Sequence, residues 1–232
     1  MNRLALLCML VLSPTAFANP PPASSPEFDF PDAVKLRNEL LNRKDFDGFG
    51  MEGAEHKAID KAHAAWKDGH GDRTLDILYE FLKKYPASIA GWRNAAEASE
   101  AWASIAKDPE HKNMFAIVGK REREIQAGLM QSIIDSEDGK SEKTAYPVLE
   151  ISEEYELVAW LHLKPQSQSL LQSPTTGRSY DVLKLKDESG KDVVLYFDIT
   201  NFWNAENRIF SEPVLKKQSI PEPAENNPPE KK

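Results

Sequence analysis

Three histidines at intervals of seven residues are the first side chains here that suggest a metal site: His56, His63 and His70. Residues seven apart on a helix lie about two turns, or roughly 10 Å, from one another. A zinc ion needs its ligands at about 2 Å from a common centre, which this spacing does not provide. His63 and His70 are therefore weak metal candidates, with Asp68 or Asp72 as further ligands. We favour a packed helical His63 and a turn residue His70, and we expect no cofactor.

Acidic residues gather where catalysis or calcium binding would use them. Glu153, Glu154 and Glu156 follow Ser152 and are candidates for paired catalytic carboxylates. The first turn of a helix is also where the helix dipole favours acids, and we favour this structural role. Residues 136–139 lack the acids at the spacing that a calcium loop requires. Since the sequence also has no nucleophile or phosphate-loop motif, it favours a noncatalytic protein.

A tryptophan and its polar neighbours are the remaining candidates for binding. Grooves of helical repeats anchor peptides with exposed aromatic, arginine and asparagine side chains. Arg93 and Asn94 follow Trp92, and Glu97 lies one turn further along. We expect Arg93, Asn94 and Glu97 to face outward, opposite the small pair 95–96. These residues and Trp92 form the predicted partner-binding site.

The region 30–136 must position that site, and its apolar residues recur with a helical period. Leu75, Leu78 and Leu82 repeat at helical spacing after a glycine-rich turn, and Pro86 ends their helix. Two helices joined by such a turn form a hairpin. We predict a helical region over 30–136 in which these three leucines pack inward.

The period changes to two in the region 137–203. Leu195, Phe197 and Ile199 alternate with other residues, and the segment 187–191 is typical of a hairpin turn. Further predicted elements are a strand over 145–151, a helix that Ser152 caps and that ends at Leu161, and a weaker strand over 167–172. The order β-α-β-β-β predicts a small, mostly antiparallel sheet with one covering helix, packed against the helical half. The predicted fold class is α+β.

The sequence predicts that the two terminal segments of the chain lie outside this fold. Residues 1–18 contain Arg3, an apolar run and small residues typical of a cleavage site. This pattern predicts a signal peptide cleaved after Ala18. A Pro/Ser-rich spacer over 19–29 follows. A polar tail over 204–232 is predicted to be disordered from about residue 213. We therefore expect a periplasmic or secreted protein.

Composition excludes several partners. The chain of 232 residues has a formal net charge of −8, so nucleic acid, which needs a basic surface, is not expected as a ligand. No later segment approaches the roughly 20 apolar residues of a membrane span. The leader holds the one cysteine of the chain, so the mature protein has no disulfide.

Two resemblances extend this interpretation. A turn, helix, proline and tryptophan resemble part of one tetratricopeptide repeat: Gly71–Asp72, Leu75–Tyr85, Pro86 and Trp92. A second set resembles an uncharacterised family of bacterial exported proteins, classed as a domain of unknown function: residues 138–141, 144–146, 151–155, 168–170, 181–182 and 196–199. That resemblance covers about 30–203. It implies the region's boundaries and a bacterial envelope setting, and it assigns no reaction or ligand.

We therefore predict an exported bacterial protein that acts as a noncatalytic interaction module and binds a protein or peptide in the cell envelope. An immunity-type partner that neutralises a secreted toxin is one alternative. A hydrolase whose site is assembled from scattered residues is another, and a deep pocket with two or more titratable groups would indicate it.

Overall fold

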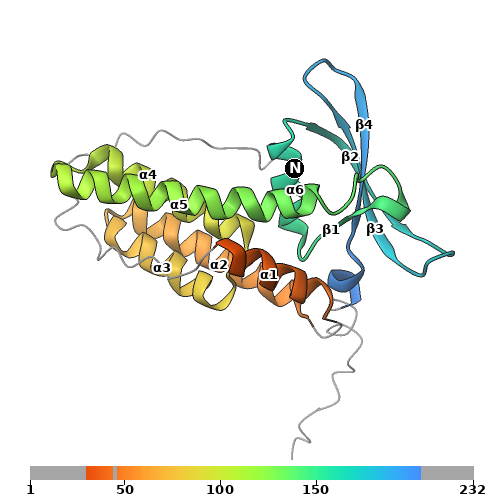
Figure 1. Cartoon of the computed structure of the whole chain (residues 1–232), viewed down its shortest axis with the longest axis horizontal. Helices are drawn as coiled ribbons and strands as arrows, with labels where there is room; N and C mark the ends of the chain where they lie inside the picture. Colours follow the sequence, from red (N-terminus) through yellow and green to blue (C-terminus); the bar gives the residue numbers. More distant parts are fainter. Residues whose placement is uncertain (1–29, 44–45, 205–232) are drawn as a thin grey trace, which may run out of the picture.

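The structure is a computed structural model that describes residues 30–43 and 46–204. The helical part comprises α1 (Phe30–Leu41), α2 (Gly48–Lys67), α3 (Gly71–Lys84), α4 (Ile89–Ile105) and α5 (Pro109–Ile134). The sheet part comprises η1 (Glu142–Thr144), β1 (Tyr146–Pro147), α6 (Ile151–Trp160), β2 (Lys164–Gln172), β3 (Ser179–Lys186) and β4 (Asp192–Asp198). Figure 1 shows the helices α1 to α5 as an elongated bundle with the sheet across one end. The predicted α+β fold class is confirmed. The predicted leader, the spacer and the tail from residue 205 lie outside the described residues.

The predicted helical hairpin is formed by α2 and α3. Leu75, Leu78 and Leu82 are at most 2% exposed, so the prediction that they pack inward is confirmed. Helix α4 packs against α5 next, and small residues let the two come close. Ala95 and Ala96 are fully buried on α4. No described helix is both long and apolar enough to cross a membrane.

The sheet has the strand order β1-β4-β3-β2. The pairs β2–β3 and β3–β4 are antiparallel, whereas β1 pairs with β4 in parallel. Phe197 is fully buried, and Leu195 and Ile199 are at most 5% exposed, which confirms the predicted inward face of β4. Gly190 has a φ of 84° in the β3–β4 hairpin, a conformation that glycine adopts without steric cost.

Two predicted boundaries in the sheet part are wrong. The strand expected over 145–151 contains only Tyr146 and Pro147, because Pro147 lacks an N–H to continue a ladder and the chain then turns into α6. The N-cap of α6 is Glu150 and not Ser152. The weaker strand is longer than expected, since β2 begins at Lys164. Helix α6 thus starts early enough for its first turn to contact both the bundle and the sheet.

Candidate functional site

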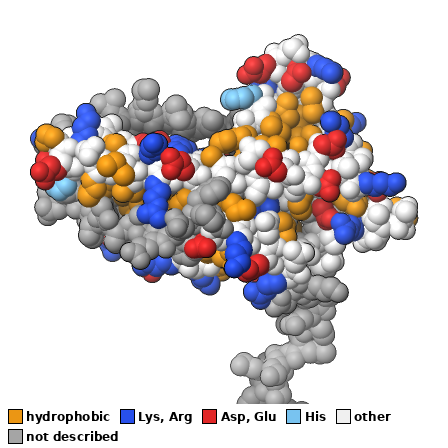
Figure 2. Space-filling model, viewed as in Figure 1, with side chains coloured by type: hydrophobic (Ala, Val, Ile, Leu, Met, Phe, Trp, Pro, Cys, Tyr) orange, Lys and Arg blue, Asp and Glu red, His pale blue; other side chains and the backbone are white. Residues whose placement is uncertain are grey.

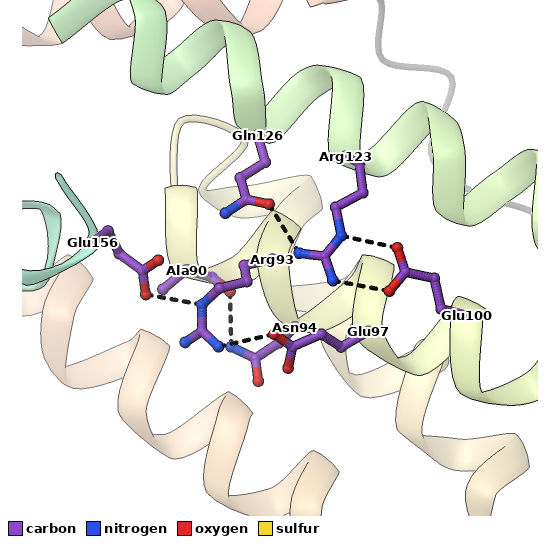
Figure 3. Close-up of polar contacts among 8 residues, drawn as sticks. All are labelled: Ala90, Arg93, Asn94, Glu97, Glu100, Arg123, Gln126 and Glu156. Atoms are coloured by element: carbon purple, nitrogen blue, oxygen red, sulfur yellow. Dashed lines mark hydrogen bonds and ion pairs between the residues drawn. The ribbon is translucent and has the colours of Figure 1, made fainter. Parts of the chain in front are cut away.

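The predicted partner-binding residues divide into two buried and two surface side chains. Trp92 is 1% exposed, and its Nε1 donates a 2.8 Å hydrogen bond to the carbonyl oxygen of Pro86. Asn94 is 5% exposed and donates from Nδ2 to the carbonyl oxygen of Ala90 at 2.8 Å (Figure 3). The expectation that Asn94 faces outward is wrong, because it lies one turn after buried Ala90 on the packed side of α4.

Arg93 and Glu97 lie at the surface of α4, with 34% and 48% of their side chains exposed. Arg93 donates from Nε to Glu156 of α6 at 2.9 Å and from Nη1 to Glu97 at 3.2 Å. Arg123 of α5 makes a neighbouring bidentate pair with Glu100, with both bonds at 2.9 Å (Figure 3). Arg93 and Arg123 thus have carboxylate partners within the chain. Binding of a separate partner protein by Arg93 and Glu97 stays a prediction.

The two metal candidates are both exposed. His63 lies on α2, and His70 is the N-cap residue of α3. The favoured packed position of His63 is wrong, since its neighbour Ala62, at 1% exposure, takes the inward position. Within the described residues, no group of three or more His, Cys, Asp or Glu side chains is arranged to hold a metal ion.

The least expected arrangement lies where α6 enters between the bundle and the sheet. Five acids from α2, the α6 region and β3 are at most 5% exposed there: Glu55, Glu150, Glu153, Glu154 and Asp181. Arg37 of α1 is the one cation of the described part of the chain that is equally buried. We call these six residues the acidic junction. A buried carboxylate is costly unless it is paired, hydrogen-bonded or protonated.

Arg37 compensates one of these acids. It donates to the Glu153 carboxylate from Nε at 3.2 Å and from Nη2 at 2.9 Å, and Nη2 also donates to Pro147 O at 2.8 Å. Oε2 of that carboxylate, which Arg37 Nη2 contacts, also accepts the Leu149 N–H at 2.8 Å. A bidentate, hydrogen-bonded pair of this kind fixes α1 against the start of α6.

Glu150 and Glu55 face each other without a buried cation between them. Ser88 donates to Glu55 Oε2 at 2.5 Å, whereas both carboxyl oxygens of Glu150 are buried and have no hydrogen-bonding partner in the described chain. Burial, followed by the charges of Glu55 and Glu153, raises the pKa of Glu150 well above its usual range. Burial and the neighbouring charges therefore favour the protonated, uncharged form of Glu150.

Glu154 and Asp181 form a second pair of facing carboxyls, which we call the carboxyl pair. Burial, and then the charge of Asp181, raises the pKa of Glu154 well above its usual range, and burial also raises the pKa of Asp181. Gln168 Nε2 donates to Asp181 Oδ2, and the Tyr155 hydroxyl donates to Gln168 Oε1 at 2.6 Å. Three carboxyl oxygens of the pair have no hydrogen-bonding partner in the described chain outside the pair itself: Asp181 Oδ1 and both oxygens of Glu154.

A hollow of about 400 Å³ opens beside the carboxyl pair. Apolar side chains form most of its wall, among them Ile151, Leu170, Phe202 and Trp203. Gln168 and Asp181 supply polar groups, and Asp181 is the one titratable residue that lines it. The hollow can therefore hold an apolar chain that ends in a polar or charged group.

Strand β2 forms the edge of the sheet next to this hollow. Its residues are exposed over nearly the whole strand, and Leu170 is 51% exposed. None of the described strands pairs with its outer side. Tyr155 and Trp160 of α6, at 44% and 42% exposure, add apolar surface near it. In Figure 2, hydrophobic side chains gather on the sheet end of the visible face.

Sequence reasoning identified part of this arrangement. It placed Glu153 and Glu154 correctly in the first turn of a helix, but it assigned them to the helix dipole and did not predict their burial. It missed Asp181 and Gln168. A signal for Asp181 exists, because it precedes Leu183 and Leu185 at a spacing of two and so occupies an inward position of β3.

The fold and the site define an α+β protein whose helical bundle and four-stranded mixed sheet meet at a buried acidic junction. A family model described as a domain of unknown function (DUF4919) matches residues 57–208, and the chain belongs to this family. The match begins within α2 and not near Phe30, so it includes the carboxyl pair and the hollow, whereas Arg37 and Glu55 precede it. Searches of curated proteins and of solved structures find no match.

Proposed function

We propose that this protein is a noncatalytic interaction module of the bacterial cell envelope that binds an extended segment of a protein partner along β2. The observation that carries this proposal is the outer side of β2, which no described strand covers. An unpaired edge strand offers a row of backbone N–H and C=O groups, and strand addition is an established mode of peptide recognition.

The two ends of β2 differ in how well they are protected against strand addition. Three features obstruct pairing at the start of β2: Lys164, Pro165 and an irregular register between Pro165 and Ser167. Edge strands are commonly protected in this way. Residues 167–172, in contrast, carry neither charge nor proline. Leu170 is exposed in the middle of that segment. We therefore propose that the partner binds along residues 167–172 of β2.

Two further properties support this function. The amino-terminal sequence predicts export, and the acidic net charge of −8 favours a basic partner through electrostatic steering. A toxin-neutralising role would use the same surface, with a basic secreted enzyme as the partner. A hydrolase site at the hollow beside β2 is less well supported, because one titratable residue lines that hollow instead of two or more.

Site-specific photo-crosslinking tests strand addition directly. A photoreactive residue is placed at Ser167 of β2 in the full chain, which is then irradiated with the envelope fraction of the bacterium that produces it. The matched control is Val194 of β4, which lies on the same face and in the same row across the sheet, through Lys184 of β3. We expect defined adducts from Ser167 and none of the same mass from Val194.

Mass spectrometry of the adducts then separates the interaction roles. A secreted basic enzyme as the crosslinked protein would favour neutralisation of a toxin over a general envelope module. Equal adducts from Ser167 and Val194, or none from either, would contradict binding along β2.

A further inference from the structure

We infer that the carboxyl pair of Glu154 and Asp181 receives the ammonium or guanidinium group of a lysine or arginine carried by the strand that binds β2. This inference rests on the proposed function and deepens it, since it names the chemistry of the partner: an extended segment with a basic side chain over the hollow.

The register of the sheet places such a side chain correctly. Leu170 of β2 pairs with Asp181 of β3, so both residues lie on the face that α6 partly covers. A strand added beyond β2 would lie two strand spacings from Asp181, which is roughly 10 Å. A lysine or arginine opposite Leu170 points to the same face, and its long apolar stem can cross the hollow while its charged end meets Asp181.

The walls of the hollow suit that side chain. Phe202 and Trp203 line it and offer aromatic surface to the stem and to a nearby cation. Gln168, held by Tyr155, donates to Asp181 Oδ2 and fixes the carboxyl, while Asp181 Oδ1 has no partner other than Glu154. Tyr155 and Gln168 are thus positioning residues, and Oδ1 is left to accept from a ligand.

The charges around the pair also favour a cation. Glu52 of α2 and Glu153 of α6 both act on Glu154 electrostatically, and the phenol of Tyr155 faces the pair as well. Arg37 is already bound to Glu153. The raised pKa values of the two carboxyls favour a protonated pair, and a bound cation, which stabilises the ionised form, releases that proton to solvent.

A small mimic of the arginine side chain tests the pair independently of strand addition. The probe is n-butylguanidinium, and n-butylurea is its neutral counterpart. Each is titrated into the full chain and followed by NMR shifts of residues at the hollow, at several pH values. We expect n-butylguanidinium alone to shift these signals. Its Kd should fall by about tenfold per pH unit while the pair is protonated, because one proton is released per cation bound.

Three variants make the result specific. Asp181→Asn removes the acceptor and should abolish binding, whereas Asp192→Asn, which changes an exposed strand carboxylate, should leave the Kd unchanged. Glu154→Gln removes one of the two carboxyls that can hold the proton, so binding should persist with a weaker pH dependence. The Glu154→Gln profile also keeps the inference testable if Asp181→Asn does not fold.

The inference is overturned if n-butylurea shifts the same signals as strongly, if folded Asp181→Asn binds like the native chain, or if Glu154→Gln keeps the native pH profile. These outcomes are separate from the crosslinking result. Guanidinium binding without Ser167 adducts would contradict strand addition and leave the cation site. Ser167 adducts without guanidinium binding would contradict the cation site alone.

Discussion

Glutamates occupy two very different settings in this molecule. On the surface shared by α4 and α5, Glu97 and Glu100 each have an arginine partner in Arg93 or Arg123 (Figure 3). At the acidic junction, five acids are buried together with one cation, Arg37, which pairs with Glu153 alone. In the first setting, ion pairs neutralise the charges at the surface. In the second, the raised pKa values of Glu150, Glu154 and Asp181 favour protonated, uncharged carboxyls.

The difference indicates where function is to be sought. Exposed ion pairs contribute little to stability and are common on helical surfaces. Buried carboxyls without cations are destabilising at neutral pH, and such groups concentrate at functional sites. The carboxyl pair also borders a hollow and an open strand edge, whereas the α4–α5 surface has its charges satisfied within the chain. The junction is therefore the stronger candidate.

The largest effect should come from removing the one buried cation. Arg37→Ala leaves Glu153 buried and unpaired, so we expect a loss of about 3–5 kcal/mol in the free energy of unfolding, measured by urea denaturation. Arg123→Ala, the matched change in the exposed Glu100 pair, should cost about 0.2–1 kcal/mol.

A double variant separates pairing from packing at the same position. Arg37→Met combined with Glu153→Leu removes both charges and should be more stable than Arg37→Ala alone, because no unpaired charge remains. Equal losses from Arg37→Ala and Arg123→Ala would mean that the two settings do not differ in energy.

The next effect is a pH dependence of stability with a defined sign. Glu150 has a pKa raised by burial and by Glu55, and burial also raises the pKa of Glu122, to about 7. An acid whose pKa is raised on folding stabilises the fold fully below its unfolded pKa of about 4.3 and loses that contribution as the pH rises through the folded pKa. Stability should therefore fall above pH 5, by up to about 1.4 kcal/mol per pH unit for each such carboxyl.

Glu150→Gln isolates one of these carboxyls. The variant should have a flatter profile than the native chain between pH 5 and 8 and should be the more stable of the two at pH 8. Glu100→Gln, which changes an exposed and paired glutamate, should follow the native profile. A Glu150→Gln profile parallel to the native one would show that Glu150 does not hold its proton in the fold.

Much of the fold could be predicted because it depends on local patterns. The spacing of Leu75, Leu78 and Leu82 and the alternation around Phe197 follow directly from helix and strand geometry. The predicted strand before α6 is too long, although Pro147, which lacks an N–H to continue the ladder, marks its end in the sequence. The resemblance to a tetratricopeptide repeat stays a prediction.

The site was harder to predict because it joins residues far apart in the sequence. Arg37 and Glu153 are separated by 116 positions, and no pattern in either segment indicates the other. Glu153 and Glu154 have the positions that a solvated helix start would give them. Their burial is decided by the packing of α6 between the bundle and β3. Asn94 shows the same error, since a polar residue type concealed a packed position.

The smallest effect concerns the surface that the sequence favoured. Arg93→Glu removes the pairs with Glu97 and Glu156 and places a third acid beside them, so we expect a cost of about 1 kcal/mol and a folded protein by circular dichroism. Photo-crosslinking from Ser167 in the Arg93→Glu variant then distinguishes binding along β2 from binding to the surface of α4. If the partner binds along β2, the adducts should persist. Their loss from a folded Arg93→Glu protein would show that α4 takes part in binding. The contrast between the ion-paired surface of α4 and α5 and the acidic junction would then no longer identify the binding site.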